Sequence, residues 1–312
     1  MFKYILKRIG YMVITMFVIA TITFFLMHNI QGSPIEAMGR NLPKQTIENY
    51  REKYGLDKPV TEQYTIFLKN AITKGDLGAS YKYPGREVSS IIKETSPISG
   101  RVGAQALILG IVIGTTFGII AALKRDTWPD YVVSIIAVLG VTVPMFIIAA
   151  ILQYFLSVKA GILPTSGWGS FKYTVIPTIA MSFATIATYA RYIRSNMLEE
   201  MGKDYVLTAE AKGVSNFNII RKHVLRNAIL PVITLLGSQI AGVFTGSFII
   251  EKIFGIPGLG FYYVSAITDR DYPMIIGTTI FYAAIFLVSQ LLVDILYGVV
   301  DPRIRVANTE GR

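Results

Sequence analysis

The sequence contains no cysteine and has few charged residues for its length. Without cysteine, a disulfide framework, a thiolate metal site and a cysteine nucleophile are all excluded. Only 16% of the residues are charged and 52% are hydrophobic, whereas soluble domains carry about a quarter charged residues. A soluble core cannot hide so much apolar surface, so the composition predicts a membrane protein. The net charge of +10 does not call for nucleic acid as a partner, because Lys and Arg in cytoplasmic loops give the same total.

Motifs for catalysis are missing as well. The sequence has no Gly-x-x-x-x-Gly-Lys-Ser/Thr run, so we do not expect this chain to hydrolyse ATP itself. The two histidines, His28 and His223, stand far apart in the sequence, and no metal-ligating cluster or activated nucleophile is visible. The sequence therefore gives no signal of an enzyme and none of a metal or cofactor in this chain.

Six apolar stretches are long enough to cross a membrane, which takes about 20 residues in a helix. They are Ile9–Met27, Val102–Leu123, Tyr131–Leu156, Thr174–Ala190, Ile229–Ile250 and Met274–Val300. Pro144 and Pro177 are expected to kink the third and fourth helices. The first stretch is longer than the core of a signal peptide, so we expect a retained span. The pattern predicts an all-α membrane protein with six transmembrane helices.

The orientation follows from Lys and Arg in the short flanks of these stretches. On one side lie Lys3, Lys7, Arg8, Lys124, Arg125, Arg191, Arg194, Lys203, Lys212, Arg221, Lys222, Arg226, Arg303, Arg305 and Arg312. The short loops of the other side hold only Lys159, Lys172, Lys252 and Arg270. Both termini are therefore predicted in the cytoplasm.

The long segment 29–100, predicted outside, has helical patterns of its own. Pro43 to Tyr54 predicts one helix with Gly55 as its stop, and Pro59 opens a second. A third short helix is expected over Arg86 to Thr95. A packed cap and a binding role are both compatible with these patterns.

The middles of the six stretches contain no ionisable residue, whereas proton-coupled transporters need such residues inside the membrane. Uncharged polar residues do occur. Candidates for lining a pathway are Thr142, Gln153, Ser182, Gln239 and Thr245. Hydrogen bonding to a neighbouring helix is the alternative role for each of them.

Residues 191–228, between the fourth and fifth stretches, are polar, basic and helical in pattern. Asp204 as a cap and Gly213 as a stop predict a short helix over Tyr205–Lys212. Ser215 is expected to cap a second helix that leads into the fifth stretch. Such an elbow can present a short helix to a cytoplasmic partner, and a solvated loop that only satisfies topology is the alternative.

The run from Asp204 to Gly213, followed by Arg226 to Pro231, resembles the coupling-loop motif of ABC importer permeases. That motif reads Glu-Ala-Ala, three residues, Gly and then Leu-Pro. Here Leu207, Thr208 and Ala209 stand at the Glu-Ala-Ala positions, and only the last Ala matches. This departure and the longer interval to Pro231 resemble the oligopeptide/dipeptide/nickel branch. Further blocks that resemble this branch are Tyr54–Pro59, Gly75–Ser80, Gly246–Glu251, Phe254–Gly260 and Asp301–Arg303.

The resemblance covers residues 1–306 and is closest to the first permease subunit of an oligopeptide uptake system. It implies a type I ABC importer permease fold, with an external helical segment between the first two spans. The implied partners are a second homologous permease, two ATPases that bind ATP-Mg, and an external substrate-binding lipoprotein that delivers peptide. Membrane lipid is a further expected partner.

The resemblance also implies where contacts and domains lie. Tyr205, Thr208, Ala209 and Gly213 would contact an ATPase. The implied division is 1–28 as an N-terminal transmembrane helix, 29–100 as an external segment, 101–300 as the permease core and 301–312 as a cytoplasmic tail. Other functions left open are a dipeptide or nickel permease of the same branch, a stand-alone secondary carrier, and a membrane receptor or scaffold.

Overall fold

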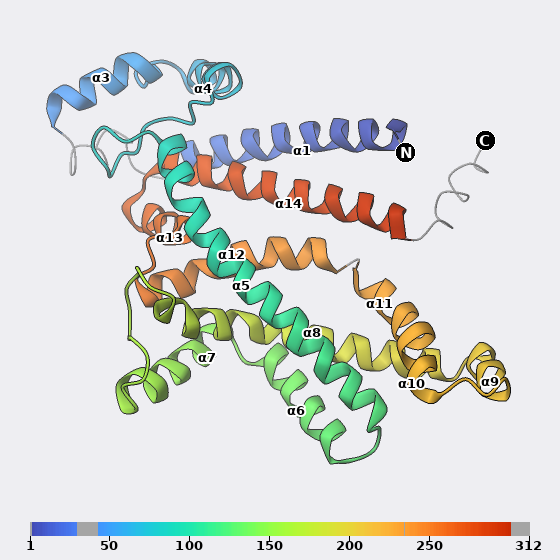
Figure 1. The fold of residues 1–312 in the computed structure, drawn as a ribbon. Coiled ribbons are helices and arrows are strands. Elements are labelled where there is room, and N and C mark those ends of the chain that lie inside the picture. Colours follow the sequence, from blue (N-terminus) through green and yellow to red (C-terminus); the bar gives the residue numbers. More distant parts are fainter. Residues whose placement is uncertain (1, 30–42, 234, 301–312) are drawn as a thin grey trace. The chain divides into compact units, whose positions relative to one another are not determined.

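The computed structural model describes residues 2–29, 43–233 and 235–300, and these residues are mainly helical (Figure 1). The helices are α1 (Phe2–Asn29), α3 (Lys44–Tyr54), α4 (Val60–Lys74), α5 (Val88–Leu123), α6 (Trp128–Thr142), α7 (Met145–Leu152), α8 (Lys172–Met201), α9 (Asp204–Ala211), α10 (Asn216–Ile219), α11 (Leu225–Ile233), α12 (Leu236–Phe254), α13 (Leu259–Asp269) and α14 (Tyr272–Val300), with π-helices at Gln153–Lys159 and Ile220–Val224. The chain groups into two compact units. The first unit comprises residues 1–101 and 244–288, and the second comprises 102–243 and 289–312.

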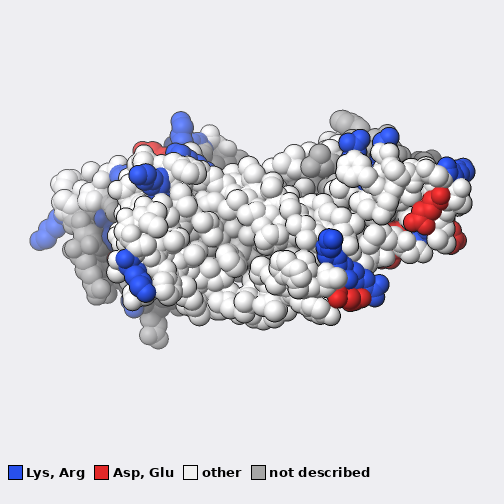
Figure 2. Space-filling model, turned by 60° about the horizontal axis from the view of Figure 1, so that its bottom comes forward, with Lys and Arg blue, Asp and Glu red and all other residues white. Residues whose placement is uncertain are grey.

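Among the described residues, four helices are long and apolar enough to cross a membrane. They are Ile5–Asn29, Val88–Leu123, Lys172–Met201 and Tyr272–Ile295. The helix pair Trp128–Thr142 and Met145–Lys159 makes a fifth candidate if it is one span. On the face drawn in Figure 2, a broad stretch of surface carries no charged side chain. This surface suits a lipid environment, because charged groups are costly there.

Helix α5 differs from the prediction, because it joins the expected external helix at Arg86–Thr95 to the second span. It runs for 36 residues with Pro97 inside it. Proline removes one backbone hydrogen bond and crowds the preceding turn, yet long helices tolerate this where neighbours compensate. The third external helix is therefore the first part of α5.

The third predicted span is not one straight helix. Helix α6 ends at Thr142, Val143 takes an extended conformation with φ −86° and ψ 121°, and α7 begins after Pro144. The two parts are bent by 110°. A residue before proline is driven out of the helical region, which explains why the chain breaks at Val143. The expected kink at Pro144 is confirmed, and it is larger than a kink inside a continuous helix.

Three other features of the helices differ from the prediction. The fifth predicted span is divided between α11 and α12, and residue 234 between them lies outside the described residues. Helix α8 continues past the predicted end at Ala190 to Met201, and Pro177 does not interrupt it. Helix α13 was not predicted; its 11 residues begin at Leu259, inside the run Phe254–Gly260, and end at Asp269.

In the second unit, α5 packs closely against α8 along three glycines spaced four residues apart. A Cβ atom at Gly114 would lie 2.7 Å from the carbonyl oxygen of Ile186 and 2.7 Å from the Cβ of Tyr189. Gly110 and Gly118 are equally crowded by α8. Small residues at this spacing let two membrane helices approach until their backbones touch. This α5–α8 seam could have been predicted from the sequence, where the spacing is visible.

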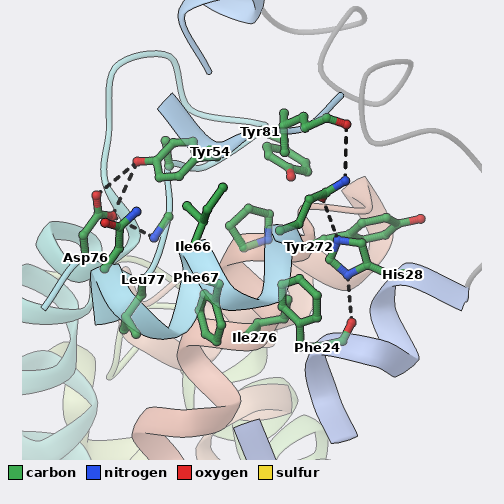
Figure 3. A pocket seen from close by; sticks show the side chains of 16 residues that line it. Phe24, His28, Tyr54, Ile66, Phe67, Asp76, Leu77, Tyr81, Tyr272 and Ile276 are labelled. Atoms are coloured by element: carbon green, nitrogen blue, oxygen red, sulfur yellow. Dashed lines mark hydrogen bonds between the residues drawn. The ribbon is translucent and has the colours of Figure 1, made fainter. Parts of the chain in front are cut away.

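In the first unit, the segment 43–87 forms a cap that packs on the start of α14 and on α1. Ile47 of α3, Tyr81 and Tyr272 form a buried apolar cluster. Figure 3 shows Phe24 of α1 and Phe67 of α4 beside a cavity of about 60 Å³. The helices predicted at Pro43–Tyr54 and after Pro59 are thus present, and they bury apolar side chains against the rest of this unit.

Polar groups hold the cap in place. The buried carboxylate of Asp271 accepts hydrogen bonds from the hydroxyl of Ser80, from the N–H of Lys82 at 3.3 Å and from the N–H of Met274 at 3.3 Å. Lys82 forms an ion pair with Asp269. Burial raises the pKa of Asp271, and the hydrogen bonds it accepts oppose that rise.

Another carboxylate, Asp76, belongs to the cap itself and lies at the edge of the cavity in Figure 3. It accepts a hydrogen bond from the N–H of Gly78 at 2.9 Å and pairs with Lys53 at 3.1 Å. The hydroxyl of Tyr54 lies 3.4 Å from both of its oxygens. Within the cap, these polar contacts therefore join the end of α3 to the chain that follows α4.

Candidate functional site: the elbow between α8 and α11

The elbow consists of residues 202–224, which connect α8 to α11 in the second unit (Figure 1). Helix α9 spans Asp204–Ala211, one residue earlier at each end than predicted. Lys203 stands at the cap position, so the expected cap at Asp204 is wrong by one residue. Asp204 instead lies in the first turn, where a negative charge favours the helix dipole.

Helix α9 ends as the sequence predicted. Gly213 has φ +73°, in the left-handed region that glycine adopts without a steric penalty. The N–H of Val214 donates to the carbonyl of Ala209 at 3.1 Å, and the N–H of Gly213 donates to that of Glu210 at 2.9 Å. These two bonds form a Schellman motif, which satisfies the last carbonyl groups of the helix.

The chain then turns into a second helix, also as predicted. Ser215 stands at the cap position, and its carbonyl accepts hydrogen bonds from the N–H groups of Asn218 and Ile219. Helix α10 continues through the π-helix into α11. The elbow is therefore a pair of short helices and not an irregular loop.

One side of α9 faces the rest of the elbow. Val206 is buried in an apolar cluster that includes Met197 of α8 and Val224, and Ala209 is partly buried against the same cluster. The hydroxyl of Tyr205 donates to Oε2 of Glu200 at 2.7 Å. Burial raises the pKa of Tyr205, and the hydrogen bond to Glu200 adds to this rise.

The other side of α9 is exposed. Leu207 is 61% exposed and Phe217 of α10 is 70% exposed. Thr208 and Gly213 are exposed as well, and among the described residues the Thr208 hydroxyl donates to the carbonyl of Asp204 in its own helix. Of the four residues predicted to contact a partner, Thr208 and Gly213 thus lie on the open side, whereas Tyr205 and Ala209 face inward. Leu207 and Phe217 were missed, although large apolar residues in a polar, basic segment were a usable signal.

An ion pair secures α8 before it reaches the elbow. The guanidinium group of Arg194 contacts both oxygens of Asp130 in the first turn of α6, at 2.5 Å and 2.7 Å. The Asp130 side chain is only 3% exposed. Such a bidentate pair fixes the geometry of both partners, so α8 leaves the helix bundle in a defined direction.

The described side chains of the residues predicted to line a pathway form hydrogen bonds within the chain. Thr142 donates to the carbonyl of Val138 at 2.9 Å, and Ser182 donates to that of Ile179 at 2.8 Å. Two other hydrogen bonds join residues further apart in the sequence. The side-chain amide of Gln153 donates to the carbonyl of Thr165 at 2.7 Å, and Gln239 accepts from the hydroxyl of Thr185 at 3.1 Å. The side chain of Thr245 lies outside the described part of the chain. Among the described side chains of this set, no hydrogen bond joins one to another.

The second unit contains a cavity of about 500 Å³ that none of the predicted pathway residues lines. Its walls come from α5, α8, α11 and α12. They are mainly apolar, for example Ile111, Ile193 and Val232. The buried hydroxyl of Tyr189 also lines it and has no hydrogen-bond partner among the described residues.

Long apolar helices with a two-helix elbow between them define a multi-span α-helical membrane protein. Comparison with known families gives the particular group. The family described as "Binding-protein-dependent transport system inner membrane component" matches residues 114–306, and a model for the N-terminal part of such components matches residues 1–89. This chain belongs to that family of membrane permease components.

Similar proteins of known name extend over nearly the whole chain. The dipeptide transport system permease protein DppB of Bacillus subtilis is 44% identical over 307 residues, covering 98% of this chain and 99% of that protein. DppB of Lactococcus lactis is 42% identical over 306 residues, with 98% and 100% covered. The oligopeptide transport system permease protein OppB of Escherichia coli K12 is 38% identical over 307 residues, again with 98% and 100% covered.

Among solved structures, an inward-facing conformation of the MetNI methionine ABC transporter has the same fold. The TM-score is 0.54 at 16% sequence identity, covering 68% of this chain and 97% of the other. At this identity the similarity concerns the fold alone. It shows that the helices follow the arrangement of an ABC importer permease.

Proposed function

We propose that this chain is a permease subunit of an ATP-driven peptide importer and forms half of the pathway together with a second, homologous permease. The observation that carries this proposal is the similarity to DppB and OppB permeases over 98% of the chain. The proposed cargo is peptide delivered by an external binding lipoprotein. The relatives include both dipeptide and oligopeptide systems, so the accepted peptide length is the first property to measure.

The proposed topology has six spans with both termini in the cytoplasm. Helices α6 and α7 together would be the broken third span, and α11 with α12 would be the fifth. The Lys and Arg residues that flank the elbow support this orientation. Residues 1–28 would be the first span, 29–100 the external segment, 101–300 the permease core and 301–312 a cytoplasmic tail.

The elbow is proposed as the site that couples this chain to an ATPase. Exposed Leu207, Thr208 and Phe217 would enter the ATPase surface, with Gly213 setting the direction of the chain between them. Tyr205 and Ala209 would support α9 from behind. Two ATPase subunits would bind ATP-Mg, and their closure would move the elbow and switch the pathway between outward and inward access.

Reconstitution tests this function. The chain, a second permease, both ATPases and the binding protein are placed in liposomes, and uptake is measured for dipeptides, longer peptides and nickel ions. Peptide uptake should require internal ATP and should persist when an uncoupler removes the proton gradient, because the predicted spans carry no ionisable residue at their centres. Uptake that continues without ATP but stops with the uncoupler would identify a secondary carrier instead. Uptake of nickel ions without uptake of peptides would identify a nickel permease.

A further inference from the structure

Glu200 lies where three helices of the second unit meet. It belongs to the last turn of α8, and its side chain is only 13% exposed. Oε2 accepts the hydrogen bond from Tyr205 of α9 at 2.7 Å, and Oε1 pairs with Lys203 at 2.5 Å. Asn227 of α11 reaches both Oε2 of Glu200 and the Tyr205 hydroxyl at 3.4 Å. One carboxylate therefore connects the end of α8, the start of α9 and the side of α11.

Apart from the packing of Tyr205, Val206 and Ala209 on the apolar cluster, few contacts hold helix α9 in place. Its eight residues are too few for a stable isolated helix, and no side chain caps its first turn. Val206 is its only buried residue. The contact between Tyr205 and Glu200 is thus the main polar link between α9 and the helices that enter and leave the elbow.

A separate bond joins α8 to α11 without involving α9. The side-chain amide of Asn196 donates to the carbonyl of Ala228 at 3.0 Å. This bond provides an internal control, because its loss would loosen the same two helices and leave the Tyr205–Glu200 contact intact.

We propose that Glu200 is a positioning residue for the coupling helix: it holds α9 to α8 and α11, so that a displacement of α9 reaches both membrane helices. This inference rests on the proposed coupling function of the elbow. A helix that stays docked in the ATPase but has lost this link would be joined to α8 and α11 by the backbone alone and would move them less. ATP would then be hydrolysed without a matching amount of peptide being carried.

The test measures peptide carried per ATP hydrolysed in the reconstituted complex. Glu200→Ala should lower this ratio about tenfold, which corresponds to about 1.4 kcal/mol of lost coupling, while ATP hydrolysis continues. Glu200→Gln keeps one oxygen as an acceptor for Tyr205 and should restore part of the ratio. Tyr205→Phe should resemble Glu200→Ala, and the double variant should be no worse than either single one, since both break the same contact.

Asn196→Ala is the matched control and should leave the ratio unchanged. Uptake and hydrolysis that fall in parallel in the Glu200 variants, with a constant ratio, would reduce Glu200 to a stabilising residue and overturn the proposal. If Glu200→Ala fails to assemble, Tyr205→Phe decides by the same criterion, because it removes a single oxygen atom. Absence of ATP-dependent uptake in the unaltered complex is a different result, which would contradict the proposed function itself.

Discussion

The elbow and the cap are both helical segments outside the apolar parts of the chain, but they are held differently. Two buried carboxylates hold the cap: Asp76 lies within it, and Asp271, just before α14, binds it through Ser80. At the elbow, the hydroxyl of Tyr205 in α9 contacts Glu200 at the end of α8 and Asn227 of α11. The cap is therefore fixed by carboxylates at separate points, whereas the polar contacts between α9 and its neighbouring helices meet at one hydroxyl group, that of Tyr205.

Exposure of apolar side chains does not distinguish the two regions. Ile72 in the cap is 79% exposed, and Leu207 in the elbow is 61% exposed. Both regions also contain a glycine stop with a positive φ, Gly75 at +64° and Gly213 at +73°. These matched features make direct comparison by mutation possible.

The largest effect is expected from Asp271→Ala, which removes the carboxylate that binds the cap at Ser80 and Lys82. Three donors would lose their buried acceptor, and leaving such groups unsatisfied costs about 3 kcal/mol in stability. The thermal unfolding temperature and the membrane abundance should both fall. Peptide carried per ATP should stay normal in the protein that remains folded. A normal unfolding temperature would show that the cap is not held by this carboxylate.

A smaller effect is expected from Leu207→Asp in the elbow. A charge placed in a partly desolvated contact costs about 2 kcal/mol, which would weaken assembly with the ATPase or uptake roughly thirtyfold. Ile72→Asp introduces the same charge at an exposed apolar position of the cap. Co-purification of the ATPases and uptake should fall only for Leu207→Asp, with normal abundance of both variants. Equal uptake by the two would remove the docking role from the open side of α9.

The smallest effect is expected from Gly213→Ala, compared with Gly75→Ala. Nothing lies within 4 Å of an added Cβ at either position, so both variants bear only the backbone cost of a left-handed residue, about 1 kcal/mol. Unfolding temperatures should shift by similar small amounts. Uptake should fall only for Gly213→Ala, because that residue sets the direction of the chain at the proposed ATPase contact. A matching loss in Gly75→Ala would make the effect one of general stability.

Sequence patterns located the apolar helices and the elbow, because mean hydropathy, glycine stops and cap residues act locally. They did not predict the features that depend on contacts between residues far apart in the sequence. Pro97 and Pro177 lie inside continuous helices, whereas Pro144 marks a break of 110°. The same residue type gives different outcomes, since the packing around it determines whether a lost hydrogen bond is tolerated. The inward direction of Tyr205 could not be predicted either, because it depends on Glu200 and Asn227 arriving from two other helices.

The α5–α8 seam limits the motions that are open to the second unit. At Gly110, Gly114 and Gly118 there is no room for a Cβ atom, so a slide that brought a larger residue of α5 to one of these positions would meet α8. We therefore expect the two helices to rotate or tilt together and not to shear. Flexing falls instead to the places where helices are interrupted, at Val143 and Pro144 and at the elbow. A movement that reaches α8 would then also reach α5, since the close packing at the three glycines carries α5 along with α8.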